Sequence, residues 1–163
     1  MRHDASLVGV NDYDLDIYAW SRRQGALLRR LAAGERVNDA DLDWPNIAEE
    51  IETVGRSERA ALRSRILNVI EHLMKLQSSP ATEPRLGWQE TIDRARSEIE
   101  DLLNDSPRLR PKVSGLVAEM LPKARRFVDK ALIRHGETAR VPLATITYNE
   151  DQVVGDWFPD AEA

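Results

Sequence analysis

The chain has 163 residues, of which 42% are hydrophobic and 31% are charged, and it contains no cysteine. This length and composition are typical of one globular domain rather than of a disordered or fibrous chain. The lack of cysteine excludes disulfides, thiol catalysis and cysteine-ligated metals. The net charge of −5 argues against broad binding to a nucleic-acid backbone, which needs a basic surface.

We expect residues 1–12 to form a flexible leader and residues 13–163 to form a single helical domain. The leader contains only one short apolar run, Leu7 to Val10, and therefore does not fit a signal peptide. No stretch of the chain is apolar over the ~18 residues that a membrane span needs. These features predict a soluble cytoplasmic protein that does not associate with a membrane.

Apolar residues recur at helical spacing in four long segments. These segments are residues 14–33, 44–77, 86–104 and 110–134. Their short connections and wide apolar stripes predict an all-α fold, a bundle of four main helices. The remaining residues should form a C-terminal arm that packs on the bundle. A capping-box-like run, Asn149–Gln152, should start a short helix in this arm near residues 153–157. In the third helix, Arg96 and Glu100 lie four residues apart and are expected to pair on a solvated face.

The second segment, Trp44 to Gln77, is the longest, and as one helix it would extend over about 50 Å. Gly55 is its weak point, where the helix could bend or another helix backbone could come close. Its apolar residues predict one buried face. This face comprises Ile47, Ile51, Val54, Ala61, Leu62, Ile66, Val69, Ile70, Leu73 and Leu76.

The same segment contains an acidic cluster and a histidine, which are the weak candidates for catalytic residues. They are Glu49, Glu50, Glu52, Glu58 and His72. A metal site of the di-iron type needs a Glu-x-x-His pattern, but Val69 stands three residues before His72. Glu58 and His72 are fourteen residues apart, which is ~21 Å of helix, so they cannot form one site directly. The plainer interpretation is an acidic helix start that complements the helix dipole, with a hydrogen-bonded histidine at the edge of the core.

Two further features are weak candidates for binding a partner. Arg56, Arg59 and Arg63 share one helix face and could bind phosphates or an acidic partner, although acidic residues of the same helix balance their charge. Trp157 and Phe158 lie in the C-terminal arm and could pack on a second molecule.

A family resemblance rests on motifs that begin in the second segment and continue outside it. The motifs are Asp43-Trp44, Ile47–Glu52, Gly55–Glu58, Leu62–Ser64 and His72–Lys75, with Tyr13, Tyr18, Trp20, Trp88, Ile92 and Asp105–Leu109 outside the segment. With them the chain resembles a bacterial family of uncharacterised helical proteins, domain of unknown function twenty-nine, from about Tyr13 to Phe158. It departs from that family at Leu76, often a tryptophan there, and at Thr145–Tyr148, where the family often has Cys-Pro before the tyrosine. The resemblance implies an all-helical fold and no established activity, cofactor or catalytic residue.

Since no catalytic constellation is evident, we expect a non-enzymatic module that binds another protein, or a second copy of itself, through an exposed face. We expect no cofactor. The alternative is a metal-assisted or hydrolytic enzyme that uses the glutamate cluster and His72. A further alternative is local nucleic-acid binding by the three arginines, which the acidic composition argues against.

Overall fold

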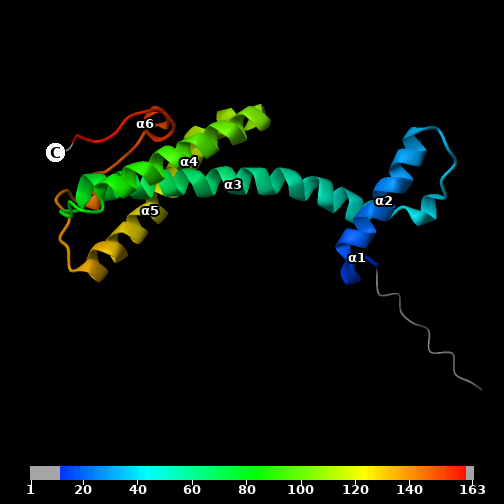
Figure 1. Cartoon of the computed structure of the whole chain (residues 1–163), viewed down its shortest axis with the longest axis horizontal. Coiled ribbons are helices and arrows are strands. Elements are labelled where there is room, and N and C mark those ends of the chain that lie inside the picture. The colour runs from blue at the N-terminus through cyan, green and yellow to red at the C-terminus, as the bar shows by residue number, and fades with distance from the viewer. Residues whose placement is uncertain (1–11, 161–163) are drawn as a thin grey trace, which may run out of the picture. The chain divides into compact units, whose positions relative to one another are not determined.

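The computed structural model describes residues 12–160, so the expected leader, apart from its last residue, lies outside the described residues. Figure 1 shows the helices, which are α1 (Asp12–Leu15), α2 (Ile17–Ala32), α3 (Trp44–Ser78), α4 (Arg85–Asp105), α5 (Val113–His135) and α6 (Glu150–Val154). Short 3-10 helices occupy Asp39–Asp41, Pro107–Lys112 and Leu143–Thr145. No strand occurs between residues 12 and 160. The predicted all-α fold, with four long helices and a short C-terminal one, is confirmed.

The residues group into two compact units, Met1–Gly55 and Arg56–Ala163. Helix α3 contributes residues 44–55 to unit 1 and residues 56–78 to unit 2. That residues 13–163 behave as one domain stays a prediction.

Unit 1 packs α2 against the start of α3 around a very small core. Its buried hydrophobic residues are Trp20, Leu42 and Ile47. The ring of Tyr13 lies edge-on to Trp20, with 4.9 Å between the ring centroids. Asp16 begins α2 because its carboxylate accepts a 2.9 Å hydrogen bond from the backbone N–H of Ala19.

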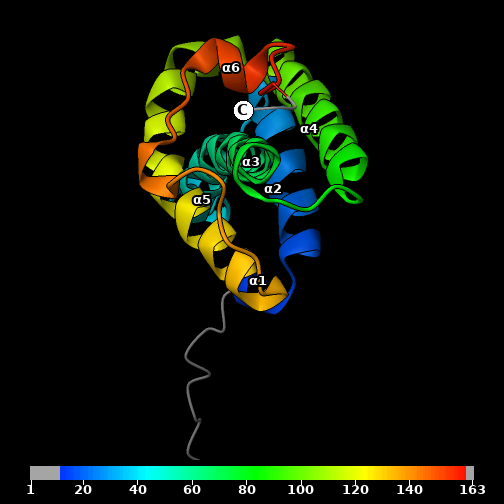
Figure 2. The same cartoon turned by 90° about the vertical axis from the view of Figure 1, so that its left-hand side faces the viewer.

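Unit 2 packs the rest of α3 with α4, α5 and the C-terminal arm around a larger core. The arm covers this core with Ile146, Tyr148 and Val153, and α6 contacts both α4 and α5 (Figure 2). The largest fully buried side chains are Leu62, Ile66, Ile70, Leu73, Met74, Ile92, Ile99 and Leu116, followed by four valines.

Two predictions about element positions are wrong. The short C-terminal helix begins at Glu150 rather than near residue 153. The predicted capping box of Asn149 and Gln152 is confirmed, but Asn149 is the N-cap residue, so the helix starts directly after it. Helix α5 begins at Val113 rather than at Arg110, since the residues before it form a 3-10 turn that contains Pro111.

The predicted buried face of α3 is wrong at two positions. Ile51 is 69% exposed and Val54 is 64% exposed, whereas Ile47 is only 8% exposed. The periodicity is correct, but the core of unit 1 ends at Ile47 and leaves the next two turns of α3 uncovered. This correction defines the candidate site.

None of the helices between residues 12 and 160 combines the length and the apolar character that crossing a lipid bilayer requires.

Candidate functional site

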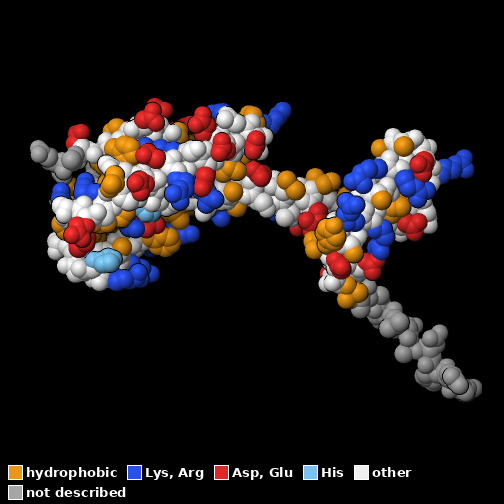
Figure 3. Space-filling view, viewed as in Figure 1, with side chains coloured by type: hydrophobic (Ala, Val, Ile, Leu, Met, Phe, Trp, Pro, Cys, Tyr) orange, Lys and Arg blue, Asp and Glu red, His pale blue; other side chains and the backbone are white. Residues whose placement is uncertain are grey.

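Unit 1 exposes four aliphatic side chains by more than half, two at α1 and the start of α2 and two on α3. We name this group the unit 1 patch; it consists of Leu15, Ile17, Ile51 and Val54. The hydrogen bond between Tyr13 and Glu50 holds α1 beside this part of α3. Hydrophobic side chains gather over α1 and along the adjoining part of α3 in Figure 3. Exposed apolar groups that cluster in this way mark sites of interaction more often than single exposed residues do.

On α3 the patch continues a regular spacing. Ile47, Ile51 and Val54 are separated by four and then three residues, and Glu58 and Ala61 continue the pattern. A 4-3 repeat is the spacing with which one helix packs along another. Ile47 is already covered by α2, whereas the next two positions have no cover. The 4-3 spacing can be read from the sequence alone, and it could have indicated a helix face suited to packing against another helix.

Glu50, one of the candidate catalytic residues, is engaged by an aromatic side chain. The Tyr13 hydroxyl donates a 2.5 Å hydrogen bond to Glu50 Oε1. This bond raises the pKa of Tyr13. Burial and the negative charges of Glu50, Glu49 and Asp14 raise that pKa further, because each disfavours the negatively charged phenolate. Glu49 and Glu52 are exposed, and Glu58 is half-buried. The surroundings of the patch are therefore acidic.

His72 lies apart from that cluster, in unit 2. It is half-buried, and its Nδ1 donates a 2.8 Å hydrogen bond to the backbone carbonyl of Asn68. Burial lowers the pKa of His72, and the charge of Lys75 acts in the same direction, while the Asn68 carbonyl and Glu71 oppose this effect. These contacts agree with a hydrogen-bonded histidine at the edge of the core. Between residues 12 and 160, no three acidic or histidine side chains lie together in a group that could hold a metal ion.

The arginine stripe of α3 faces an acidic residue of α5. Arg59 donates a 3.1 Å hydrogen bond to Glu119, and Arg63 lies 3.5 Å from the other oxygen of the same carboxylate. All three side chains remain partly exposed, so the pairing contributes little stability. Arg56 also has an interaction partner within the chain.

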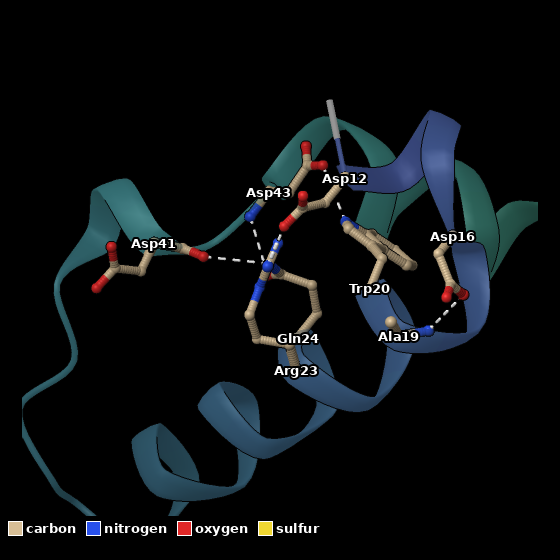
Figure 4. A network of polar contacts seen from close by, with 8 residues as sticks. All are labelled: Asp12, Asp16, Ala19, Trp20, Arg23, Gln24, Asp41 and Asp43. Atoms are coloured by element: carbon tan, nitrogen blue, oxygen red, sulfur yellow. Dashed lines mark hydrogen bonds and ion pairs between the residues drawn. The ribbon is translucent and has the colours of Figure 1, made fainter. Parts of the chain in front are cut away.

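Asp43, the residue before α3, joins α2 to the start of α3 through hydrogen bonds, two of which Figure 4 shows. Its carboxylate accepts hydrogen bonds from Trp20 Nε1 at 3.0 Å and from Asn46 Nδ2 at 2.8 Å. Its backbone N–H donates to Gln24 Oε1 at 3.0 Å, and Gln24 Nε2 donates to the Asp41 carbonyl at 3.2 Å. The side chain of the buried Gln24 thus has both its oxygen and its nitrogen hydrogen-bonded to the backbone between α2 and α3. These bonds position α2 on α3 and so determine which turn of α3 the core of unit 1 covers.

The C-terminal arm is held by its own chain. Arg96, which is only 7% exposed, donates hydrogen bonds to the backbone carbonyls of Val153, Gln152 and Trp157, at 3.1, 2.8 and 2.6 Å. Its guanidinium also lies 4.8 Å from the centroid of the Phe158 ring. The predicted solvated pairing of Arg96 with Glu100 is therefore wrong. Arg96 lies four residues after Ile92 and three before Ile99, so its place on the apolar stripe was the signal for burial.

A hollow of about 320 Å³ lies where the end of α3 meets the end of α5. Trp88, Val128 and Leu132 form part of its apolar wall. At its edge, Ser79 donates a 2.6 Å hydrogen bond to Glu137, and this bond joins the residue that follows α3 to the segment that follows α5. The polar groups here stabilise the junction.

The comparisons with known proteins give one match. A family model described as Domain of unknown function DUF29 matches residues 13–158. No curated protein and no solved structure matches the chain.

Proposed function

We propose that this chain, which belongs to the family Domain of unknown function DUF29, is a protein-interaction module that binds its partner through the unit 1 patch. The observation that carries the proposal is the exposure of Ile51 and Val54, 69% and 64%, on the same face as the buried Ile47. A partner helix that covered them would continue the packing that α2 begins.

Burial energetics support the proposal. Fully burying an isoleucine or valine side chain is worth about 1.5–3 kcal/mol relative to leaving it exposed. Unit 1 has a core of only three buried hydrophobic residues, and small units bury too little apolar surface to be more than marginally stable. A partner on the patch would therefore stabilise unit 1 as well as gain affinity for itself.

The acidic surroundings define the partner's chemistry. Asp14 and Glu49 lie close enough to Tyr13 to act on its ionisation, and Glu50 is bonded to it. A complementary surface would carry apolar side chains bordered by lysine or arginine, because opposite charges favour encounter and the correct orientation.

Site-specific photo-cross-linking in producing cells tests the proposal. A benzophenone amino acid at position 54 should give a discrete protein adduct that disappears when Ile51→Gln is added. The same amino acid at position 86 of α4, which replaces an exposed leucine outside the patch, is the control, and its adducts should not depend on Ile51. The proposal fails if position 54 gives no adduct, or gives one that Ile51→Gln leaves unchanged.

The other functions expected from the sequence stay untested. Catalysis by the glutamate cluster with His72, and nucleic-acid binding by Arg56, Arg59 and Arg63, have no observation here that favours them over protein binding. Partner binding by Trp157 and Phe158 would compete with the contacts that Arg96 makes to the arm. Bacterial origin and cytoplasmic location stay predictions of the sequence.

A further inference from the structure

Helix α5 carries a second exposed surface, and its basic charge is opposite to that of the acidic surroundings of the unit 1 patch. We name it the α5 basic face; it consists of Lys123, Arg126, Phe127, Lys130, Ile133 and Arg134. These residues recur every three or four positions and so share one side of the helix. All six are exposed, Ile133 at 71%. The ammonium of Lys123 lies 5.6 Å from the centroid of the Phe127 ring.

The two surfaces lie in regions of the chain that carry opposite net charge. Residues 107–140 contain nine basic and three acidic residues, although the whole chain has a net charge of −5. The described part of unit 1, residues 12–55, contains ten acidic and five basic residues. The acidic surroundings of the unit 1 patch and the cationic border of the α5 basic face therefore have opposite signs, and both surfaces present apolar side chains between their charges.

We infer that the unit 1 patch of one molecule docks on the α5 basic face of a second copy of this chain. The inference rests on the proposed function, since it names the partner of the same patch. Ile51 and Val54 would pack against Phe127 and Ile133 of the second copy. Lys123 and Lys130 of the second copy would face the carboxylates around Tyr13. The contact joins two different surfaces, so repetition of it gives either a closed assembly or a chain of molecules.

Charge complementarity favours this partner over a simple pairing of like surfaces. Two unit 1 patches face to face would bring the acidic residues around Tyr13 together, and two α5 basic faces would bring lysines and arginines together. The heterologous contact avoids both repulsions. Because both surfaces are partly exposed, salt should weaken the contact.

The experiment compares purified full-length chains by analytical ultracentrifugation over a range of concentration and salt. The wild type should form species heavier than the 18.5 kDa chain, and salt should reduce them. A patch variant, Ile51→Gln with Val54→Gln, and a face variant, Lys130→Glu with Ile133→Gln, should each associate at least tenfold more weakly. Leu86→Gln, which replaces a residue 67% exposed on α4, and Arg94→Glu are matched controls that should associate like the wild type. Circular dichroism confirms that each variant is folded.

Mixing the two variants decides the inference. The patch variant retains its α5 basic face and the face variant retains its unit 1 patch, so the mixture should regain one contact per pair and form a heterodimer. A mixture that stays monomeric overturns the inference. So does a face variant that still associates as well as the wild type, since the patch would then bind something other than α5.

The same experiments distinguish failure of this inference from failure of the proposed function. If the wild type stays monomeric at every concentration while position 54 cross-links to a protein of another mass in an Ile51-dependent way, the inference fails and the interaction function stands. If the wild type stays monomeric and position 54 gives no adduct, both fail. An adduct between two copies of this chain, joining position 54 to α5, supports both.

Discussion

The hydroxyl of Tyr13 lies 2.5 Å from Glu50 Oε1, although the two residues are 37 positions apart in the chain. This hydrogen bond joins α1, which carries Leu15 of the unit 1 patch, to α3 immediately before Ile51. Tyr13 also packs on Trp20, so one side chain contributes to the polar border of the patch and to the core beneath it.

Tyr13→Phe should therefore loosen α1 without unfolding unit 2. The variant keeps the ring contact with Trp20 but removes the hydrogen bond that the hydroxyl donates to a carboxylate, and bonds to charged acceptors are stronger than those between neutral groups. Hydrogen exchange should become faster for the amides of α1 and the start of α2. Tyr18→Phe, at an exposed tyrosine of α2, is the control. Unchanged exchange in Tyr13→Phe would show that the bond does not hold α1.

Ile51→Gln and Val54→Gln should change the free energy of unfolding of the isolated chain by no more than about 0.5 kcal/mol, as is usual for exposed positions. Ile47→Ala should cost about 2–4 kcal/mol, because it leaves a cavity between α2 and α3. Chemical denaturation measures both, at concentrations below self-association. A large loss in Ile51→Gln would mean that Ile51 is covered within the molecule.

Much of this fold follows from the residue pattern, since a 3.6-residue apolar period is a local property that each helix carries. Periodicity states which face of α3 is apolar but not whether anything covers it, and for this reason Ile51 and Val54 were predicted to be buried. The bond between Tyr13 and Glu50 could not be predicted, because no local pattern relates residues so far apart. The pairing expected for Arg96 failed for a different reason. A position four residues from Glu100 is compatible with a surface pair, but the neighbours Ile92 and Ile99 place Arg96 on the buried side.

Arg96→Lys should release the C-terminal arm. A lysine cannot reach three carbonyls at once, and each buried carbonyl left without a donor costs about 1–3 kcal/mol. We expect unit 2 to lose at least ~2 kcal/mol of stability and the arm to become accessible to proteases near Trp157. Arg94→Lys, at an exposed position two residues earlier, should behave like the wild type. Equal protease resistance in the two variants would contradict a clamping role for Arg96.

The free energy of unfolding should decrease as the pH is lowered, over a range that the pKa of His72 determines. Its pKa in the folded chain is lowered from the ordinary value of 6.5, so the folded state favours the neutral ring. The contribution of the neutral His72 to stability is complete above pH 6.5. It is lost as the pH falls from 6.5 towards the lower pKa of the folded state, because over this range the unfolded chain binds a proton at His72 and the folded chain does not. His72→Gln should flatten the dependence of stability on pH between 7 and 5. A His72→Gln variant whose stability depends on pH as steeply as that of the wild type would contradict this role for His72.

Gly55→Ala should raise the stability of α3. A Cβ at this position would meet nothing within 4 Å, and replacing a glycine inside a helix by alanine is worth about 1 kcal/mol. Thermal unfolding followed by circular dichroism measures the change. A lower melting temperature would indicate that the backbone at Gly55 is not regularly helical or that the position is crowded.

The most direct test of the account is the accessibility of position 54. Because the chain has no cysteine, Val54→Cys introduces its only thiol, and the rate of alkylation of that thiol reports whether the patch is covered. We predict that alkylation slows as the protein concentration rises. Salt, or Lys130→Glu with Ile133→Gln in the same chain, should restore the fast rate. A fast rate that is the same at every concentration would contradict a patch that binds a second copy.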